Sequence, residues 1–191
     1  MPAFHHSPLL SFIASSDSEL TGLLSLAYAR DGLTSQRSQQ TIAWAQDIFR
    51  LRETLQDLHN RRPDTAQWTV LLEFNIPRKL KRIDVVLLAG DSIVILEQKS
   101  HIPTLDDCRQ AEEYALLLHY FHQPSNKRKI IPLVVSPTAH PYTPNSQNEL
   151  PFLETAAFWI EPVERLACAL PFFWCSRIRM YVGERCNLRF R

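Results

Sequence analysis

The chain has 191 residues, of which 45% are hydrophobic and 21% are charged, a composition typical of one folded domain. The glycines are Gly22, Gly32, Gly90 and Gly183. Their wide spacing leaves no Walker A loop and no GxGxxG turn, which excludes a P-loop motor and a Rossmann dehydrogenase. The formal net charge is +1, so a nucleic-acid partner would have to bind a local basic patch.

The sequence gives no sign of export or of a membrane span. The apolar stretch 166–175 is about half as long as a spanning helix, and no basic segment precedes the first apolar residues. The cysteines, which form no CxxC pair, are Cys108, Cys168, Cys175 and Cys186. We therefore expect free thiols and a cytoplasmic protein that binds no membrane.

Two helices are predicted in the first third of the chain. Residues 1–16 are expected to form a loose leader, and a helix is expected to begin behind the Ser/Asp cap at Asp17. An amphipathic helix is predicted over 39–60, where apolar residues recur every three or four positions. The segment 61–64 is expected to end it, because it contains Pro63.

The period of the pattern then changes from 3.6 to 2, which indicates strands. The alternation over 68–77 predicts that one face carries Trp68, Val70, Leu72, Phe74 and Ile76, and that the polar face carries Glu73 and Asn75. A basic turn leads to a second strand at 82–88, and a tight turn at 89–91 joins it to a third strand at 92–100.

A capped helix over 104–123 and a short, mostly buried strand within 127–139 follow. The order helix, three strands, helix and strand predicts an α/β fold with a central sheet flanked by helices. Residues 17–140 would form this core. Residues 141–191 are expected to be a C-terminal extension that packs on the same domain.

Asp84 on the second strand, with Glu97 and Lys99 on the third, is the strongest chemical signal. Residues two apart in a strand face the same side, so Glu97 and Lys99 project together while Gln98 points away. About five residues separate Asp84 from the turn and about six separate the turn from Glu97, so antiparallel pairing brings the carboxylates level. Two carboxylates and a lysine suit a divalent ion and a phosphate. An ion pair at a solvated strand end is the alternative.

The stretch 82–100, RIDVVLLAGDSIVILEQKS, resembles the Asp, hairpin and Glu-x-Lys pattern of the PD-(D/E)xK nuclease superfamily. With LLEFNIPR, RQAEEYALLLHYFH and KIIPLVVSPTA, it more narrowly resembles the nuclease-like N-terminal domain of bacterial Schlafen-type, helicase-like proteins. The resemblance covers about residues 40–140. It implies a restriction-endonuclease-like core with the order α-β-β-β-α-β and a central mixed sheet.

By this resemblance, Asp84 and Glu97 would bind Mg²⁺ or Mn²⁺, and Lys99 would be the catalytic base or would hold the phosphate. Gln110 and Tyr114 match a glutamine-xxx-tyrosine pattern on the next helix, where such a pair supports the site. Their spacing places both on one helix face.

A further acid often completes such sites. The candidates are Glu19 and Glu53 on the predicted helices and Glu73 on its strand. Gln98 stands where the superfamily usually has an apolar residue, which suggests that its face of the sheet is not fully dry. The basic turn before Asp84 is expected to contact phosphates through Arg78, Lys79, Lys81 and Arg82.

The residues and the resemblance together predict a metal-dependent nuclease, a hydrolase of phosphodiester bonds in nucleic acid, with DNA as the first candidate. The resemblance also implies a bacterial defence context. The alternatives are a non-catalytic binding module of the same fold and a structural protein of a defence assembly. The resemblance also implies a homodimer, or an ATPase or helicase partner in trans or in a longer protein, since no phosphate loop precedes Arg191.

Overall fold

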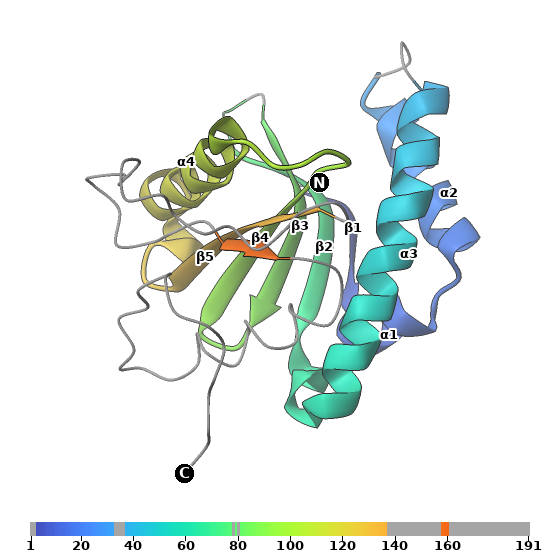
Figure 1. Cartoon of the computed structure of the whole chain (residues 1–191), viewed down its shortest axis with the longest axis horizontal. Coiled ribbons are helices and arrows are strands. Elements are labelled where there is room, and N and C mark those ends of the chain that lie inside the picture. The colour runs from blue at the N-terminus through green and yellow to red at the C-terminus, as the bar shows by residue number, and fades with distance from the viewer. Residues whose placement is uncertain (1–2, 33–36, 78, 80, 137–157, 161–191) are drawn as a thin grey trace.

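The computed structural model describes residues 3–32, 37–77, 79, 81–136 and 158–160 (Figure 1). The strands are β1 (Ala3–Pro8), β2 (Thr69–Asn75), β3 (Arg82–Ala89), β4 (Ser92–Gln98), β5 (Lys129–Val135) and β6 (Phe158–Ile160). The helices are α1 (Leu9–Ala14), α2 (Asp17–Arg30), α3 (Arg37–Arg61) and α4 (Leu105–Phe121), with short 3-10 helices η1 (Pro63–Gln67) and η2 (Gln123–Ser125).

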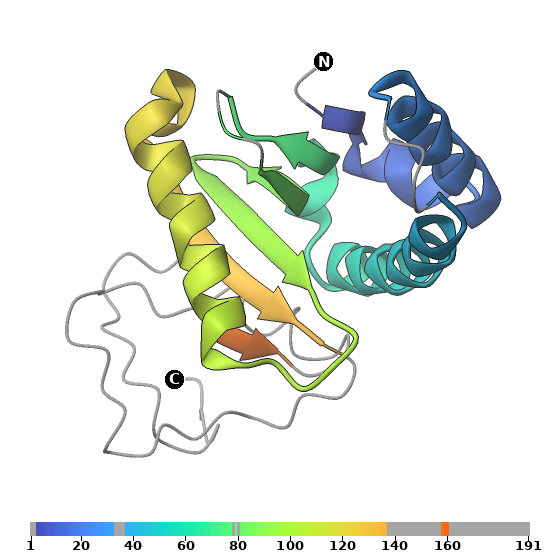
Figure 2. The ribbon, with the colours of Figure 1, turned by 90° about the horizontal axis from the view of Figure 1, so that it is seen from above.

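The described strands form one mixed sheet in the order β1-β2-β3-β4-β5-β6. The strands from β1 to β4 pair antiparallel, whereas β4 pairs parallel with β5 and β5 with β6. A parallel pair needs a crossover connection, which α4 provides between β4 and β5. Helices α1–α3 cover one face of the sheet and α4 covers the other (Figures 1 and 2). The predicted α/β class and the predicted α-β-β-β-α-β order, here α3-β2-β3-β4-α4-β5, are confirmed.

Two hydrophobic cores lie on the two faces of this sheet. The larger one joins the sheet to α1–α3 through side chains such as Phe12, Leu55 and Leu87, which are completely buried. The other joins it to α4 through Ile95 and Leu118. Because β3 and β4 are covered on both faces, their stretches 85–89 and 93–96 are continuously apolar, as expected for central strands.

The prediction of a loose leader is wrong for residues 3–14. Strand β1 pairs with β2, with His5 opposite Leu72, and α1 completely buries Leu9 and Phe12. The sequence shows no strand pattern here, because His5 and His6 are both polar. The edge strand forms because pairing with β2 stabilises it more than its own composition does. The predicted C-terminal extension lies outside the described residues, apart from β6.

Strand β2 changes face at Glu73, so the prediction that its apolar residues share one face is wrong. Glu73 has a φ of 53°, and no other described residue except glycine has a positive φ. Leu72 packs in the core beneath α1–α3, whereas Phe74 packs in the core beneath α4. This flip moves Glu73 from the expected polar face into the interior, where its exposed fraction is 6%.

Strand β3 changes face at the neighbouring position. Ile83 packs beneath α4 and Val85 packs beneath α1–α3, although the two residues are two positions apart. The register is the same on both sides of the interruption, with Leu72 opposite Val85 and Phe74 opposite Ile83. Glu73 therefore lies opposite Asp84, and the regular alternation of both strands breaks at these two acids.

Cys108 is a buried free thiol, as predicted, and the other cysteines lie outside the described residues. Within the part of the chain that the structure describes, no helix has both the length and the apolar character needed to cross a bilayer.

Candidate functional site

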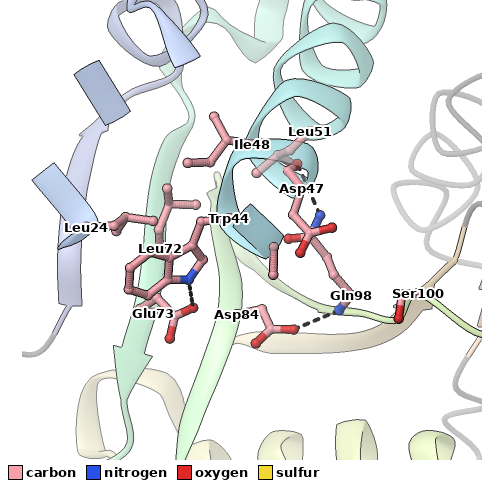
Figure 3. Close-up of a pocket in the computed structure, with 11 residues that line it drawn as sticks. Leu24, Trp44, Asp47, Ile48, Leu51, Leu72, Glu73, Asp84, Gln98 and Ser100 are labelled. Carbon is pink, nitrogen blue, oxygen red and sulfur yellow. Dashed lines mark hydrogen bonds between the residues drawn. The ribbon is translucent and has the colours of Figure 1, made fainter. Parts of the chain in front are cut away.

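The site begins where the pairing of β3 with β4 ends. The paired register of the hairpin ends with Val85 opposite Leu96, and Asp84 and Glu97 are the next residues along the two strands. Beyond these pairs, the side chain of Asp84 replaces a backbone carbonyl as the acceptor: its Oδ2 accepts a hydrogen bond from the backbone N–H of Gln98 at 2.9 Å (Figure 3). The hairpin thus brings the two predicted carboxylates to the same open end of adjacent strands.

Asp84 borders a pocket of about 230 Å³ between the sheet and helices α2 and α3 (Figure 3). The apolar part of the wall is formed by Leu24, Ala43, Trp44, Ile48, Leu51 and Leu72. The polar part is formed by Asp47, Glu73, Asp84, Gln98 and Ser100. Gln98 Nε2 donates to the backbone carbonyl of Asp47 at 3.3 Å. The polar wall agrees with the expectation that the face of Gln98 is not dry.

Glu97 is held by a side chain of α4 and by Lys99, and its carboxylate is near enough to Asp84 to raise the pKa of Asp84. Its Oε1 accepts hydrogen bonds from Gln110 Nε2 at 2.7 Å and from Lys99 Nζ at 3.1 Å. Gln110 also accepts from Lys99 Nζ at 3.0 Å through its Oε1, and donates to Tyr114 Oη at 2.7 Å. The structure therefore brings together Glu97, Lys99, Gln110 and Tyr114, and their catalytic roles stay predictions.

The second oxygen of Glu97 lacks a partner. Oε2 is buried, and none of the described residues makes a hydrogen bond to it. A buried carboxylate oxygen without a donor is costly and uncommon in folded proteins. This atom is therefore a candidate ligand for an external cation.

The charges around Asp84 favour such a cation. Burial raises the pKa of Asp84 well above its usual value, and the neighbouring carboxylates of Glu97 and Glu73 raise it further. Burial also raises the pKa of Glu97 and of Glu73. The three carboxylates are thus poorly solvated and repel one another. A divalent ion would relieve this repulsion.

Lys99 is held in its charged form. Burial alone would lower its pKa, but the carboxylates of Glu97 and Asp107 outweigh burial and raise the pKa. A lysine in this state offers a fixed positive charge at neutral pH. It is poorly suited to accept a proton from water.

Of the three acids that the sequence offered, Glu73 is the one that lies at the site. Its Oε1 accepts from Trp44 Nε1 at 2.7 Å, and its Oε2 pairs with Arg82 Nε at 2.8 Å. Glu19 and Glu53 are exposed on α2 and α3, outside the described lining of the pocket. The interruption of β2 at Glu73 is what turns its carboxylate towards Asp84.

Asp47 is an acid of the pocket that the sequence analysis missed. It lies on α3, is half-buried, and has a pKa raised mainly by burial. Its charge also raises the pKa of Glu73. The signal was present in the helical spacing, because Asp47 stands three residues after Trp44 and four before Leu51, inside the apolar stripe of α3.

The basic turn is divided between the surface and the interior. Arg78 lies outside the described residues. Lys79 is exposed, and its Nζ lies 5.0 Å from the centroid of the Phe121 ring. Lys81 forms an ion pair with Glu113 on α4, and both side chains are more than two-fifths exposed. Lys79 and Lys81 thus stay accessible to a charged partner.

Arg82 instead turns inward. Besides its ion pair with Glu73, its guanidinium lies 4.9 Å from the Phe4 ring centroid and 5.6 Å from the Tyr28 ring centroid. These contacts connect β1, α2 and β2 around one cation. Arg82 thus holds Glu73 in place in this structure, and its predicted phosphate contact stays a prediction.

The donor set fits a hard divalent ion. Among the described residues, no group of three or more His, Cys, Asp or Glu side chains is arranged to hold a metal. Mg²⁺ is, however, commonly bound by one or two carboxylates, with water and substrate phosphate completing its shell. The unpartnered oxygen of Glu97 and the crowded carboxylate of Asp84 are the two groups that would serve as such ligands, and their role stays a prediction.

No family model matches this chain, and no curated protein matches its sequence significantly. One similar solved structure is a repair endonuclease from Pyrococcus abyssi, with 19% sequence identity and a TM-score of 0.37 over 57% of this chain and 46% of that chain. Another is EndoMS in complex with dsDNA, with 21% identity and a TM-score of 0.37 over 57% of this chain and 44% of that one. This chain therefore spans less than half the length of either protein. These similarities are too low to assign a family, and they give no support to the narrower Schlafen-type resemblance.

Proposed function

We propose that the protein is a metal-dependent nuclease that hydrolyses phosphodiester bonds in nucleic acid, with DNA as the first candidate substrate. The observation that carries the proposal is the buried, unpartnered Oε2 of Glu97, next to the crowded carboxylate of Asp84 and the ammonium group of Lys99. A fold seldom keeps so many charges on its central strands unless they serve chemistry.

Asp84 and Glu97 would hold Mg²⁺ or Mn²⁺. When bound, such an ion polarises phosphate oxygens and makes water a better nucleophile at neutral pH. Gln110 orients the ligand and the lysine together, because its amide donates to Glu97 and its carbonyl accepts from Lys99.

Lys99 stabilises negative charge in this proposal. The sequence left two roles open, a base and a phosphate holder, and the raised pKa supports the second. A fixed ammonium beside the scissile phosphate lowers the energy of the transition state without reorganisation. Lys79 and Lys81, which are exposed at the β2–β3 turn, would contact backbone phosphates.

Nicking of supercoiled plasmid tests the proposal. The parent protein is expected to nick with Mg²⁺ or Mn²⁺ and to stop when EDTA is added. Asp84→Asn and Lys99→Ala are each expected to reduce the rate on the order of 10²–10³-fold. Glu53→Gln is the matched control, since it removes an exposed carboxylate of α3 outside the pocket, and it should nick like the parent.

Calorimetry with Mn²⁺ and with Ca²⁺ provides a second, independent measurement. The parent is expected to bind either ion, and Asp84→Asn is not. If the parent binds neither ion and cleaves neither plasmid nor RNA, the nuclease proposal is wrong. A direct measurement of nucleic-acid affinity would then test the non-catalytic binding module.

A further inference from the structure

Asp107, in the first turn of α4, makes different contacts with its two carboxylate oxygens. Oδ2 accepts from the backbone N–H of Thr104 at 2.7 Å and from the Thr104 hydroxyl at 2.8 Å. His101 Nε2 lies 3.1 Å from the same oxygen. Oδ1 faces the other way and lies 3.3 Å from Lys99 Nζ. One carboxylate thus contacts both the helix terminus and the lysine of the candidate site.

Only one of these oxygens is needed for the helix. Thr104 and Asp107 form a capping box, in which the Thr104 hydroxyl also accepts from the Asp107 N–H at 3.4 Å. A capping box uses one carboxylate oxygen, and an ordinary cap leaves the other to solvent. The Asp107 side chain is only 11% exposed, so Oδ1 is instead held against Lys99.

The ammonium of Lys99 has three N–H donors and three protein acceptors within reach. These acceptors are Glu97 Oε1 at 3.1 Å, Gln110 Oε1 at 3.0 Å and Asp107 Oδ1 at 3.3 Å. Glu97 is on β4, and the other two are on α4. A lysine side chain is long and flexible, so a third fixed acceptor removes much of the freedom that two would leave.

We propose that Asp107 is a positioning residue for Lys99: Oδ2 anchors the carboxylate at the N-terminus of α4, and Oδ1 fixes the ammonium group beside Glu97. The inference rests on the proposed function, because it concerns how precisely Lys99 is placed at a scissile phosphate. Misplacement of a reacting group by about 1 Å can cost on the order of 10²-fold in rate.

Two substitutions separate positioning from helix capping. Asp107→Asn replaces one oxygen by an NH₂ group, which must face either the Lys99 ammonium or the donors of Thr104. Thr104→Ala removes the hydroxyl from the same cap and leaves the Asp107–Lys99 contact in place. Both variants weaken the N-terminus of α4, and only the first acts on Lys99.

Steady-state nicking kinetics with Mg²⁺ on the full chain give the first readout. Asp107→Asn is expected to lower kcat by about 10- to 100-fold and to change KM by less than about 3-fold. Thr104→Ala is expected to keep kcat within about 3-fold of the parent. Equal losses of kcat in the two variants, or a parent-like kcat in Asp107→Asn, would overturn the inference.

The order of the Lys99 side chain gives a readout that does not depend on activity. Relaxation of ¹³C at Cε, assigned with Lys99→Ala, is expected to show a restricted Lys99 in the metal-free parent and in Thr104→Ala. In Asp107→Asn the order parameter should fall. An unchanged order parameter would overturn the positioning role even if the protein nicked no substrate, so this measurement separates it from the proposed function.

If Asp107→Asn does not fold, Asp107→Glu takes its place. Glutamate is a usual residue at this position of a capping box, so the cap persists while the carboxylate shifts by one methylene. The expected loss of kcat is about 10-fold. A parent-like kcat together with a parent-like Lys99 order parameter would contradict the inference.

Discussion

The Asp107→Asn substitution also makes a prediction for stability, and its magnitude follows from the folded state. Burial alone would raise the pKa of Asp107, but hydrogen bonds from Thr104, together with His101 and Lys99, lower it from 3.8 to about 2. At 1.36 kcal/mol per pKa unit, this gap corresponds to about 2.4 kcal/mol. Solvent screening at the open side of the cap reduces the expected contribution to about 1–2 kcal/mol at neutral pH.

The sign of the pH dependence is fixed by the lowered pKa. The ionised carboxylate stabilises the fold fully above the unfolded value of 3.8, and the contribution is lost as the pH falls towards about 2. In urea unfolding followed by circular dichroism, Asp107→Asn should be less stable than the parent by about 1–2 kcal/mol at pH 7. The difference should shrink at pH 3 and below.

A neighbouring aspartate in the same helical turn provides the control. The Asp106 side chain is 88% exposed and pairs only with the exposed Arg109 among the described residues. Asp106→Asn removes the same charge from the N-terminus of α4, and we expect a change of less than about 0.5 kcal/mol. A loss that is equal for both aspartates, or a loss for Asp107→Asn that is as large at pH 2 as at pH 7, would refute the reasoning.

Three further predictions concern the surroundings of the site. Trp44→Phe leaves Glu73 Oε1 without its 2.7 Å donor and should cost about 1–3 kcal/mol in urea unfolding. Arg82→Met leaves the buried Glu73 unpaired and should cost about 3–5 kcal/mol in the same assay, whereas Lys81→Met, at an exposed ion pair, should cost less than about 1 kcal/mol. Joint replacement of Lys79 and Lys81 by Ala should weaken binding to DNA and flatten its dependence on salt, as measured by fluorescence anisotropy at several NaCl concentrations.

The order of the elements could be predicted because it follows from local patterns of apolar, polar and turn residues. The change from a period of 3.6 to one of 2 at Trp68 and the turn at Gly90 depend only on neighbours in the sequence. Strand β1 could not be found in this way. Its residues His5 and His6 carry no strand pattern, and their conformation follows from pairing with Leu72 and Leu71.

The same distinction applies to the site. The alternation of β4 predicts that Glu97 and Lys99 share a face, and the structure brings them to Gln110. The spacing of α3 places Asp47 in the apolar stripe, but neither the partners of Asp47 in the pocket nor the placement of Glu73 could be predicted. A positive φ at Glu73 reverses the face of the strand, and Asp47 becomes part of the pocket only when α3 packs on the sheet. Both depend on tertiary contacts that a periodic pattern does not encode.

The interruption of β2 and β3 indicates that this end of the sheet holds buried carboxylates at a cost in folding free energy. Strained or non-glycine left-handed backbone costs on the order of 1–3 kcal/mol and tends to occur at functional sites. Here the left-handed residue is Glu73, and it lies opposite Asp84, whose ionisation the fold already disfavours. Removal of that charge should therefore stabilise the protein that lacks a metal ion.

Asp84→Asn tests this directly. The amide oxygen can still accept from the Gln98 N–H, but the side chain carries no charge beside Glu97 and Glu73. Because a raised pKa means that the fold loses stability as the pH rises above the ordinary value, the variant should gain about 0.5–2 kcal/mol at pH 8 in EDTA. Ca²⁺ at about 100 times its dissociation constant should stabilise the parent by about 2.7 kcal/mol and the variant hardly at all. Thermal unfolding with and without Ca²⁺ measures both effects. A variant that is destabilised in EDTA and still stabilised by Ca²⁺ would show that Asp84 supports the fold and does not bind the ion.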